Sequence, residues 1–344
     1  PLFFYSKELL IFIRQPTDLA TYASQYLQIV GFAMFPALIL HVVKSYLSAR
    51  ELMSFVLVAT LVGFLINIPL NYVFIFGKLG FPNLGVEGSA LASLIVNIVT
   101  AISVCFYATV KHPEQALFKR IWRPDWKALG DVIKLGLPIS VTSLAESGLF
   151  AGSTIMMGWL GTVAVAAHGI ALHITSLTFV IHVGLSSAAT IQVGQAYGAT
   201  KFLDLKRSTF AAFFASSLIV LLTVFTFLVM PKFLVSLFVD PNAPELDEIL
   251  VYGVWLLYMA ALFSTADAAQ VMALGVLRGM QDTSIPMGMA IFSYWIVGLP
   301  AAYFLCFSLN WGGVGLWAGL AMGLACAAIG LIGRFFILYR KITT

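Results

Sequence analysis

Two acidic side chains in this sequence lie deep within apolar runs, where an acid is expected to do chemistry. The first, Glu146, lies near the middle of the almost wholly apolar residues 132–160, 15 residues from both Asp131 and Gly161. At a helical rise of about 1.5 Å per residue this is roughly 22 Å from either end, too far for the carboxylate to reach interfacial water. Because an ionised group there costs several kcal/mol, Glu146 should face a polar cavity, bind a cation or take a proton.

The second acid is Asp267, in the apolar run 256–279, where it precedes Arg278 by 11 residues or about 17 Å of helix. The other 13 of the 15 acidic residues lie at or near predicted helix ends or in loops. Two carboxylates held near one another disfavour double ionisation, so the pair should hold a proton or a sodium ion. We therefore take Glu146 and Asp267 as candidate cation-binding residues. The alternative is that each acid bonds a serine or threonine and only locks two helices together.

Three histidines within the apolar runs are weaker candidates. His168 and His173 are five residues apart, about 140° around a helix, and no cysteine or carboxylate lies beside them at metal-ligand spacing. His168 is expected to be structural, whereas His173 and His182 could line a cavity. No catalytic residue, cofactor or metal is expected, apart from a candidate Na⁺ at the two acids.

Two amides flank a proline in the first half of the chain. Asn67 and Asn71 lie one turn apart around Pro69, which breaks a backbone hydrogen bond. Such a place serves either helix packing or a cavity. The candidate residues for lining or supporting a cavity are Phe263, Gln270, His173, Asn67 and Asn71.

The elements that position these residues must be membrane helices. The chain of 344 residues is 60% hydrophobic and only 10% charged, roughly half the charge of an ordinary soluble domain. Apolar stretches of about 20 residues or more recur along its whole length, each long enough to cross a bilayer. They are continuous rather than alternating, which favours helices over a barrel. The fold class is therefore an all-α polytopic membrane protein. Its three cysteines show no metal-type spacing and imply no disulfide.

Nine full spans are predicted, after a helix fragment at 1–13 that is too short to cross. The first residue is Pro1 rather than Met, so we expect an N-terminal part of a longer protein to precede this chain. The predicted spans are 22–47, 54–77, 86–110, 131–160, 163–198, 206–236, 246–277, 284–307 and 313–339.

Basic residues predict the orientation, because they accumulate on the cytoplasmic side. One side of the predicted topology carries 4 of the 19 lysines and arginines, and the other carries 15, including those of the 111–130 loop and of the C-terminal end. We expect a cytoplasmic C-terminus. The same bias explains the basic loop, so no nucleic-acid partner is expected.

An internal repeat divides the chain into two lobes. Residues 67–92 match 298–320, and Pro69, Tyr72 and Gly85 correspond to Pro300, Tyr303 and Gly313. Six spans separate the copies, so the repeat is parallel, which is a recurrent plan of transporters. We assign residues 128–344 to a second lobe of helices 7 to 12. Residues 1–127 form the C-terminal half of a first lobe, with the end of helix 3, helices 4 to 6 and an inter-lobe loop at about 111–130.

Several motifs along the whole chain carry a family resemblance. In order they are DVIKLGLPISVTSLAESGLFAGSTIMMGWLG, VAVAAHGIALHITSL, IQVGQAYGA, DAAQVMALGVLRGMQDT and SYWIVGLPAAY. Their order and spacing resemble the multidrug and toxic compound extrusion (MATE) transporters, in particular the bacterial NorM-like branch. Such transporters have twelve helices in two pseudo-symmetric lobes.

The resemblance implies an antiporter of the bacterial inner membrane that exports cationic or amphipathic organic compounds in exchange for Na⁺ or H⁺. It also implies that Glu146 and Asp267 correspond to the acids of the family's second-lobe cation site. Relatives with a sodium site can have a tyrosine where this chain has Phe263, so the coupling ion stays open. We expect a monomer in the lipid bilayer.

Three other function classes are weighed against this interpretation. A flippase for lipid-linked oligosaccharides, in the same superfamily, would line its cavity with basic residues, and the sequence places none deep in a span. A membrane enzyme would need paired acids for magnesium or a histidine near the headgroups. A passive channel or scaffold would show no dependence on a cation gradient.

Overall fold

The structure is a computed structural model that describes residues 3–12, 17–111, 113–115, 117–118, 123–239 and 245–343. Within these ranges it contains helices and no strand, and nine of the helices are long and apolar enough to cross a membrane. The predicted fold class is therefore confirmed. The chain forms two compact units, Pro1–Pro124 and Asp125–Thr344, which are described separately.

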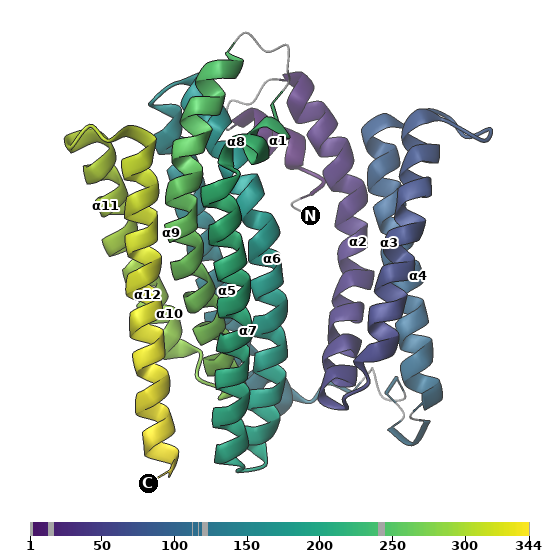
Figure 1. Cartoon of the computed structure of the whole chain (residues 1–344). Coiled ribbons are helices and arrows are strands. Elements are labelled where there is room, and N and C mark those ends of the chain that lie inside the picture. Colours follow the sequence, from purple (N-terminus) through teal and green to yellow (C-terminus); the bar gives the residue numbers. More distant parts are fainter. Residues whose placement is uncertain are drawn as a thin grey trace. The chain divides into compact units, whose positions relative to one another are not determined.

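The first unit contains the short helix α1 and three long helices (Figure 1). Helix α4 packs against both α2 and α3. Gly88 of α4 allows the close approach to α3, because a Cβ there would lie 2.6 Å from the backbone of Phe74. The bounds are α1 Ser6–Phe12, α2 Thr17–Ala49, α3 Met53–Phe76 and α4 Gly85–Lys111, followed by a single 3₁₀ turn at Pro113–Gln115.

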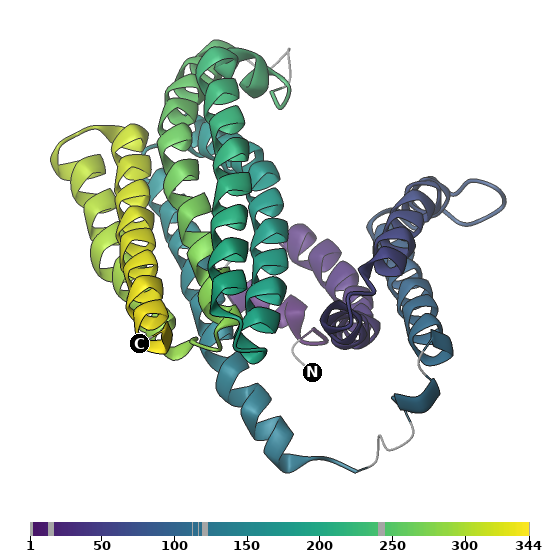
Figure 2. The ribbon, with the colours of Figure 1, turned by 60° about the horizontal axis from the view of Figure 1, so that its bottom comes forward.

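The second unit is built around α9 (Leu246–Gly279), which packs against α6, α7 and α12. Figure 2 shows α12 and α6 on opposite sides of α9, as does Figure 1. More than half of the α9 residues are buried, so this helix is the core of the unit rather than a lipid-facing element. The remaining bounds are α5 Trp126–Gly158, α6 Thr162–Gly198, α7 Phe202–Val229, α8 Pro231–Ser236, α10 Ser284–Ile291, α11 Leu299–Tyr303 and α12 Gly312–Thr343.

One predicted span is divided in the structure. Hydropathy predicts a single helix over 206–236, but α7 ends at Val229 and the short α8 begins at Pro231. Proline has no N–H for the helical ladder and is favoured in the first turn of a new helix. The break at Met230 follows from this residue.

The span predicted at 284–307 is continuous but not uniformly α-helical. Two π-helical segments, Phe292–Gly298 and Phe304–Ser308, flank α11. Pro300 cannot donate the backbone bond that an α-helix would direct to Ile296, so the helical ladder cannot continue regularly there. Segments of π-helix occur frequently at functional sites, and the first of these carries Tyr294, which is fully buried.

Glycines bring α12 against this span. Gly315, Gly319 and Gly323 are spaced four apart, on one face of α12, and a Cβ on any of them would overlap backbone atoms of residues 298–305. Small residues at this spacing allow close helix packing in membranes. The result is a tight helix pair that fixes the segment carrying Tyr294.

Two hydroxyls join α6 to α9 by a similar close approach. Ser186 Oγ donates to the carbonyl of Val271, and Thr190 Oγ1 donates to that of Gly275, both at 2.8 Å. A Cβ on Gly275 would overlap Ser186. These contacts hold α9 in a fixed register, with Asp267 directed into the unit.

We predict that Gly319→Ala lowers the thermal stability of the purified protein. In an open helix alanine is favoured over glycine by about 1 kcal/mol, but here the added methyl group would overlap Ala302, and overpacking costs about 1–3 kcal/mol. A melting curve read with a thiol-reactive dye measures this, because Cys306 of the same helix pair is buried. Gly136→Ala is the matched control, since its Cβ would meet no atom within 4 Å. Equal melting temperatures for the two variants would contradict the proposed close packing.

Candidate cation site

The second unit brings the two predicted acids together. Glu146 comes from α5 and Asp267 from α9, and their charges interact. Asp267 is only 4% exposed. Glu146 Oε1 and Asp267 Oδ1 are both buried, and neither has a hydrogen-bond partner among the described residues. Two buried acid oxygens without partners are expensive in a protein interior, so this pair is the candidate place for a positive ligand.

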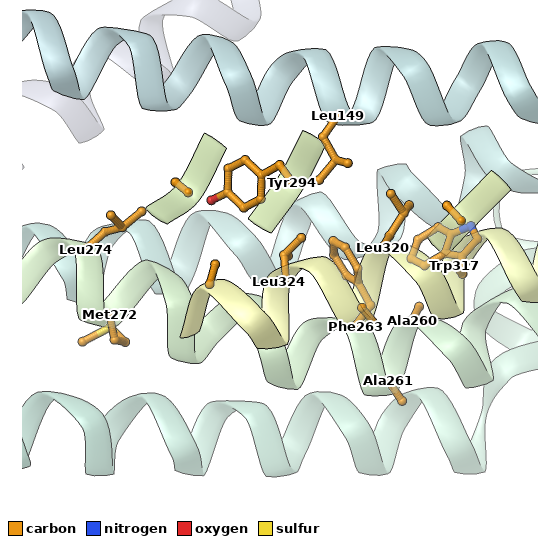
Figure 3. Close-up of a cluster of buried hydrophobic side chains, with 14 of the residues drawn as sticks. Leu149, Ala260, Ala261, Phe263, Met272, Leu274, Tyr294, Trp317, Leu320 and Leu324 are labelled. Carbon is orange, nitrogen blue, oxygen red and sulfur yellow. The ribbon is translucent and has the colours of Figure 1, made fainter. Parts of the chain in front are cut away.

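Gln270 and Tyr294 complete this group of buried polar side chains. Gln270 follows Asp267 by one turn and is close enough to interact with Glu146 and Tyr294, although no direct hydrogen bond joins them in the described part of the chain. The amide atoms of Gln270 and the hydroxyl of Tyr294 are also buried without partners. Figure 3 shows Tyr294 lying between Leu149 and Leu274, with its hydroxyl directed toward the Leu274 end. Oxygens from three separate helices thus converge.

Arg278 supplies a charge that the sequence analysis did not assign to the site. It was counted with the basic residues of the cytoplasmic side, yet its guanidinium interacts with Glu146 and Tyr294. Eleven residues turn a helix through about 20° more than three full turns, so Arg278 and Asp267 lie on one face of α9. That spacing is the signal that could have identified it.

A cavity of about 280 Å³ opens beside Asp267. Most of its lining is apolar, and Asp267 is the one ionisable side chain in it. The hydroxyls of Thr175 and Ser176 in the lining donate to carbonyls of their own helix. The cavity therefore suits an apolar group that carries a positive charge. Its lining residues are Phe150, Leu172, Thr175, Ser176, Phe179, Phe263 and Asp267.

Phe263 forms part of an aromatic wall of this cavity. Its ring packs edge-on against Phe150 and Trp317, with centroid separations of 6.0 and 5.3 Å. Figure 3 shows Phe263 and Trp317 on adjacent helices. Phe263 lacks the hydroxyl of a tyrosine, but Tyr294 brings a hydroxyl to the acids from another helix.

His168 is a buried link between three helices. Its Nδ1 accepts a hydrogen bond from Trp317 Nε1 at 3.1 Å, and its Nε2 lies 3.4 Å from Ser153 Oγ and 3.3 Å from Thr154 Oγ1. Because an indole N–H can only donate, Nδ1 is the acceptor and Nε2 carries the proton of the neutral ring. His168 thus ties α6 to α12 and α5.

The other polar candidates lie outside the group of acids. His173 is exposed and its ring packs on Phe238, with centroids 5.3 Å apart. His182 Nδ1 lies 3.0 Å from Ser216 Oγ on α7. In the first unit, Asn71 Nδ2 donates to Asn67 Oδ1 at 2.8 Å, so these two amides satisfy each other.

The nine spans of the described residues and the buried acids define a structural class of membrane protein. They describe a polytopic helical membrane protein with a charged site enclosed within one bundle, as in secondary transporters.

The comparisons give the family. The MatE family model matches residues 2–73 and 138–304, so the chain belongs to the MatE family. It is 39% identical over 343 residues to the "Probable multidrug resistance protein NorM" of Agrobacterium fabrum, covering 99% of this chain and 74% of that protein. It is 40% identical over 346 residues to the protein of the same name from Rhizobium meliloti, covering 100% and 74%. The crystal structure of a MATE in complex with MaD3S has the same fold, with a TM-score of 0.87 at 22% identity, covering 99% of this chain and 74% of that one.

We predict that Trp317→Phe destabilises the second unit. The change keeps an aromatic ring beside Phe263 but removes the N–H that satisfies His168, and an unsatisfied buried acceptor costs about 1–3 kcal/mol. Thermal unfolding of the purified variant measures the loss. Trp311→Phe is the control, because that side chain is exposed. A melting temperature equal to that of the control would show that the bond to His168 contributes nothing.

Proposed function

We propose that this chain acts as a cation-coupled antiporter that exports cationic or amphipathic organic compounds. The observation that carries the proposal is the pair of buried acid oxygens, on Glu146 and Asp267, that lack a partner among the described residues. Family membership and the multidrug resistance names of the relatives support an efflux function.

The charges of the site favour uptake of one positive charge. Glu146 and Asp267 carry two negative charges when ionised, and Arg278 provides one positive charge close to Glu146. One negative charge is left uncompensated in a low-dielectric interior, where a net charge is costly. A single monovalent cation or proton neutralises the group.

The available ligand atoms fit either coupling ion. Acid, amide and hydroxyl oxygens from Glu146, Asp267, Gln270 and Tyr294 are hard ligands of the kind that alkali and alkaline-earth cations prefer. A proton on one acid would achieve the same neutrality without requiring a full set of ligands. The ligand atoms therefore do not distinguish sodium from a proton, and an efflux experiment has to identify the coupling ion.

The organic substrate would occupy the cavity beside Asp267. Its aromatic side chains, including Phe150, Phe179 and Phe263, can contact apolar groups and the face of a positive charge. Substrate and ion would then compete for Asp267, and each weakens the binding of the other by the same coupling free energy. An ion that binds two conformations with different affinity shifts the equilibrium between them, which is the requirement for alternating access.

The proposal includes a location and an orientation. The protein works as a monomer in the bacterial plasma membrane with its C-terminus in the cytoplasm, because basic residues accumulate on that side. No catalytic role is proposed for any residue.

Replacing Asp267 by Asn should abolish cation-coupled efflux while leaving insertion intact, because the amide keeps the shape but cannot offer a negative charge. Dye efflux in inverted vesicles, with sodium and pH gradients imposed separately, measures the effect and identifies the ion. Asp204→Asn is the matched control, since Asp204 is exposed. Efflux by the Asp267→Asn variant at the normal rate would show that the site is misplaced.

Replacing Tyr294 by Phe should raise the half-saturating Na⁺ concentration about tenfold, equivalent to about 1.4 kcal/mol, if Na⁺ is the coupling ion. The variant removes one oxygen from the group and keeps the ring. Tyr303→Phe in the same span is the control, because Tyr303 is exposed. An unchanged sodium dependence beside a functional sodium gradient would remove Tyr294 from the ligand set.

A further inference from the structure

A groove on the second unit lies away from the acids and has no role in the proposed transport. It has a volume of about 190 Å³ and lies between α7 and α12, over α9. Its floor is Ala273 and Val276, both buried. The walls are Thr209, Phe210 and Phe213 of α7 and Ile332, Phe335 and Phe336 of α12. The small side chain of Ala273 leaves the space between the two larger walls.

The interior of the groove offers no polar contact. Thr209 is the one residue in its lining with a polar side-chain atom, and its hydroxyl donates to the carbonyl of Leu205 at 2.9 Å. A hydrophilic or charged ligand would therefore gain nothing inside. The groove belongs to a bundle that crosses the membrane, so hydrocarbon is the material that can fill it.

Cationic side chains border one end of this groove. Lys206 precedes Phe210 by one helical turn and lies 5.9 Å from the centre of its ring. Arg340 follows Phe336 by one turn in the last turn of α12, beside Lys341. Four spans connect the start of α7 to the end of α12, which places both at the same end of the bundle (Figure 1). Positive charge thus lies just beyond the apolar groove, at the ends of the spanning helices α7 and α12.

Further charged and aromatic side chains lie at the same end of the unit. Arg334 forms a 2.8 Å salt bridge with Asp282, and Arg207 lies 3.9 Å from Asp204. Tyr339, one turn beyond Phe335 and stacked on it with centroids 5.9 Å apart, places an aromatic ring with a polar tip at the same level. Tyrosine is typical of the membrane interface.

We propose that this groove is a binding site for an anionic phospholipid. One acyl chain lies between α7 and α12 on Ala273, and the phosphate contacts Lys206 and Arg340. Headgroups that carry a net negative charge are favoured over zwitterionic ones, whose own cation already compensates the phosphate.

Native mass spectrometry of the delipidated full chain tests this inference. The protein is titrated with equal amounts of dioleoylphosphatidylglycerol and dioleoylphosphatidylcholine, and the bound lipid is counted. We expect selective retention of phosphatidylglycerol by the unchanged protein. The Lys206→Gln and Arg340→Gln double variant should lose this preference about tenfold. The double variant Lys78→Gln and Lys232→Gln removes the same charge elsewhere and is the control.

A second pair of variants tests the acyl chain separately. Phe336→Ala removes a wall of the groove and should weaken retention of phosphatidylglycerol, whereas Phe214→Ala removes an exposed phenyl group of α7 that does not line it. Deacylated glycerophosphoglycerol should not displace the lipid. Equal retention of the two lipids, an effect of the glutamine variants no larger than their control, or displacement by the deacylated headgroup would each overturn the proposal.

Discussion

The structure of the second unit depends on the cost of placing charge in an apolar interior. Glu146 and Asp267 lie among helices with little other polarity, and within the described ranges Arg278 is the cation that interacts with Glu146. Nothing in a protein core favours an uncompensated carboxylate, so such residues persist where a ligand neutralises them. Tight packing matters around such a group, because a loosely packed bundle would admit water and weaken the electrostatic interactions among these side chains.

The packing around the acids comes from small residues rather than from large complementary surfaces. Glycines of α12 approach the span carrying Tyr294, and serine and threonine of α6 bond directly to the backbone of α9. Lipid is as apolar as a leucine side chain, so these close contacts, and not hydrophobic burial, hold helices together in a membrane. They fix the span that carries Tyr294 and the helix that carries Asp267.

Much of this arrangement could be predicted from the sequence, because the membrane imposes simple rules. Continuous apolar stretches give the nine spans, and their isolated acids give the candidate site. Pro231, in contrast, ends a helix that hydropathy alone would continue. In the sequence Tyr294 is one aromatic residue among many. The structure shows that it is buried near the acids, on a π-helical segment that the glycines of α12 pack against.

Arg278 is instructive in a different way. Its position at a helix end agrees with the accumulation of basic residues on the cytoplasmic side. That agreement gives no sign of its interaction with Glu146. Long basic side chains can reach about a turn or more along their own helix, and a charge assigned from its backbone position can therefore act elsewhere. The sequence shows that Asp267 and Arg278 lie on one face of a helix. Only the three-dimensional structure shows that the guanidinium of Arg278 interacts with Glu146.

Different contacts hold the two helices that carry the acids, α5 and α9. Hydroxyls of Ser186 and Thr190 on α6 bond to the backbone of α9, whereas α5, which carries Glu146, is contacted by ring nitrogens of its neighbours. Trp295 Nε1 donates to the carbonyl of Ala145 at 3.2 Å, and His168 faces Ser153 and Thr154. The helix that carries Glu146 and the helix that carries Asp267 are thus held by different side chains, so a substitution at Trp295 or His168 would disturb the surroundings of Glu146 without removing the bonds between α6 and α9.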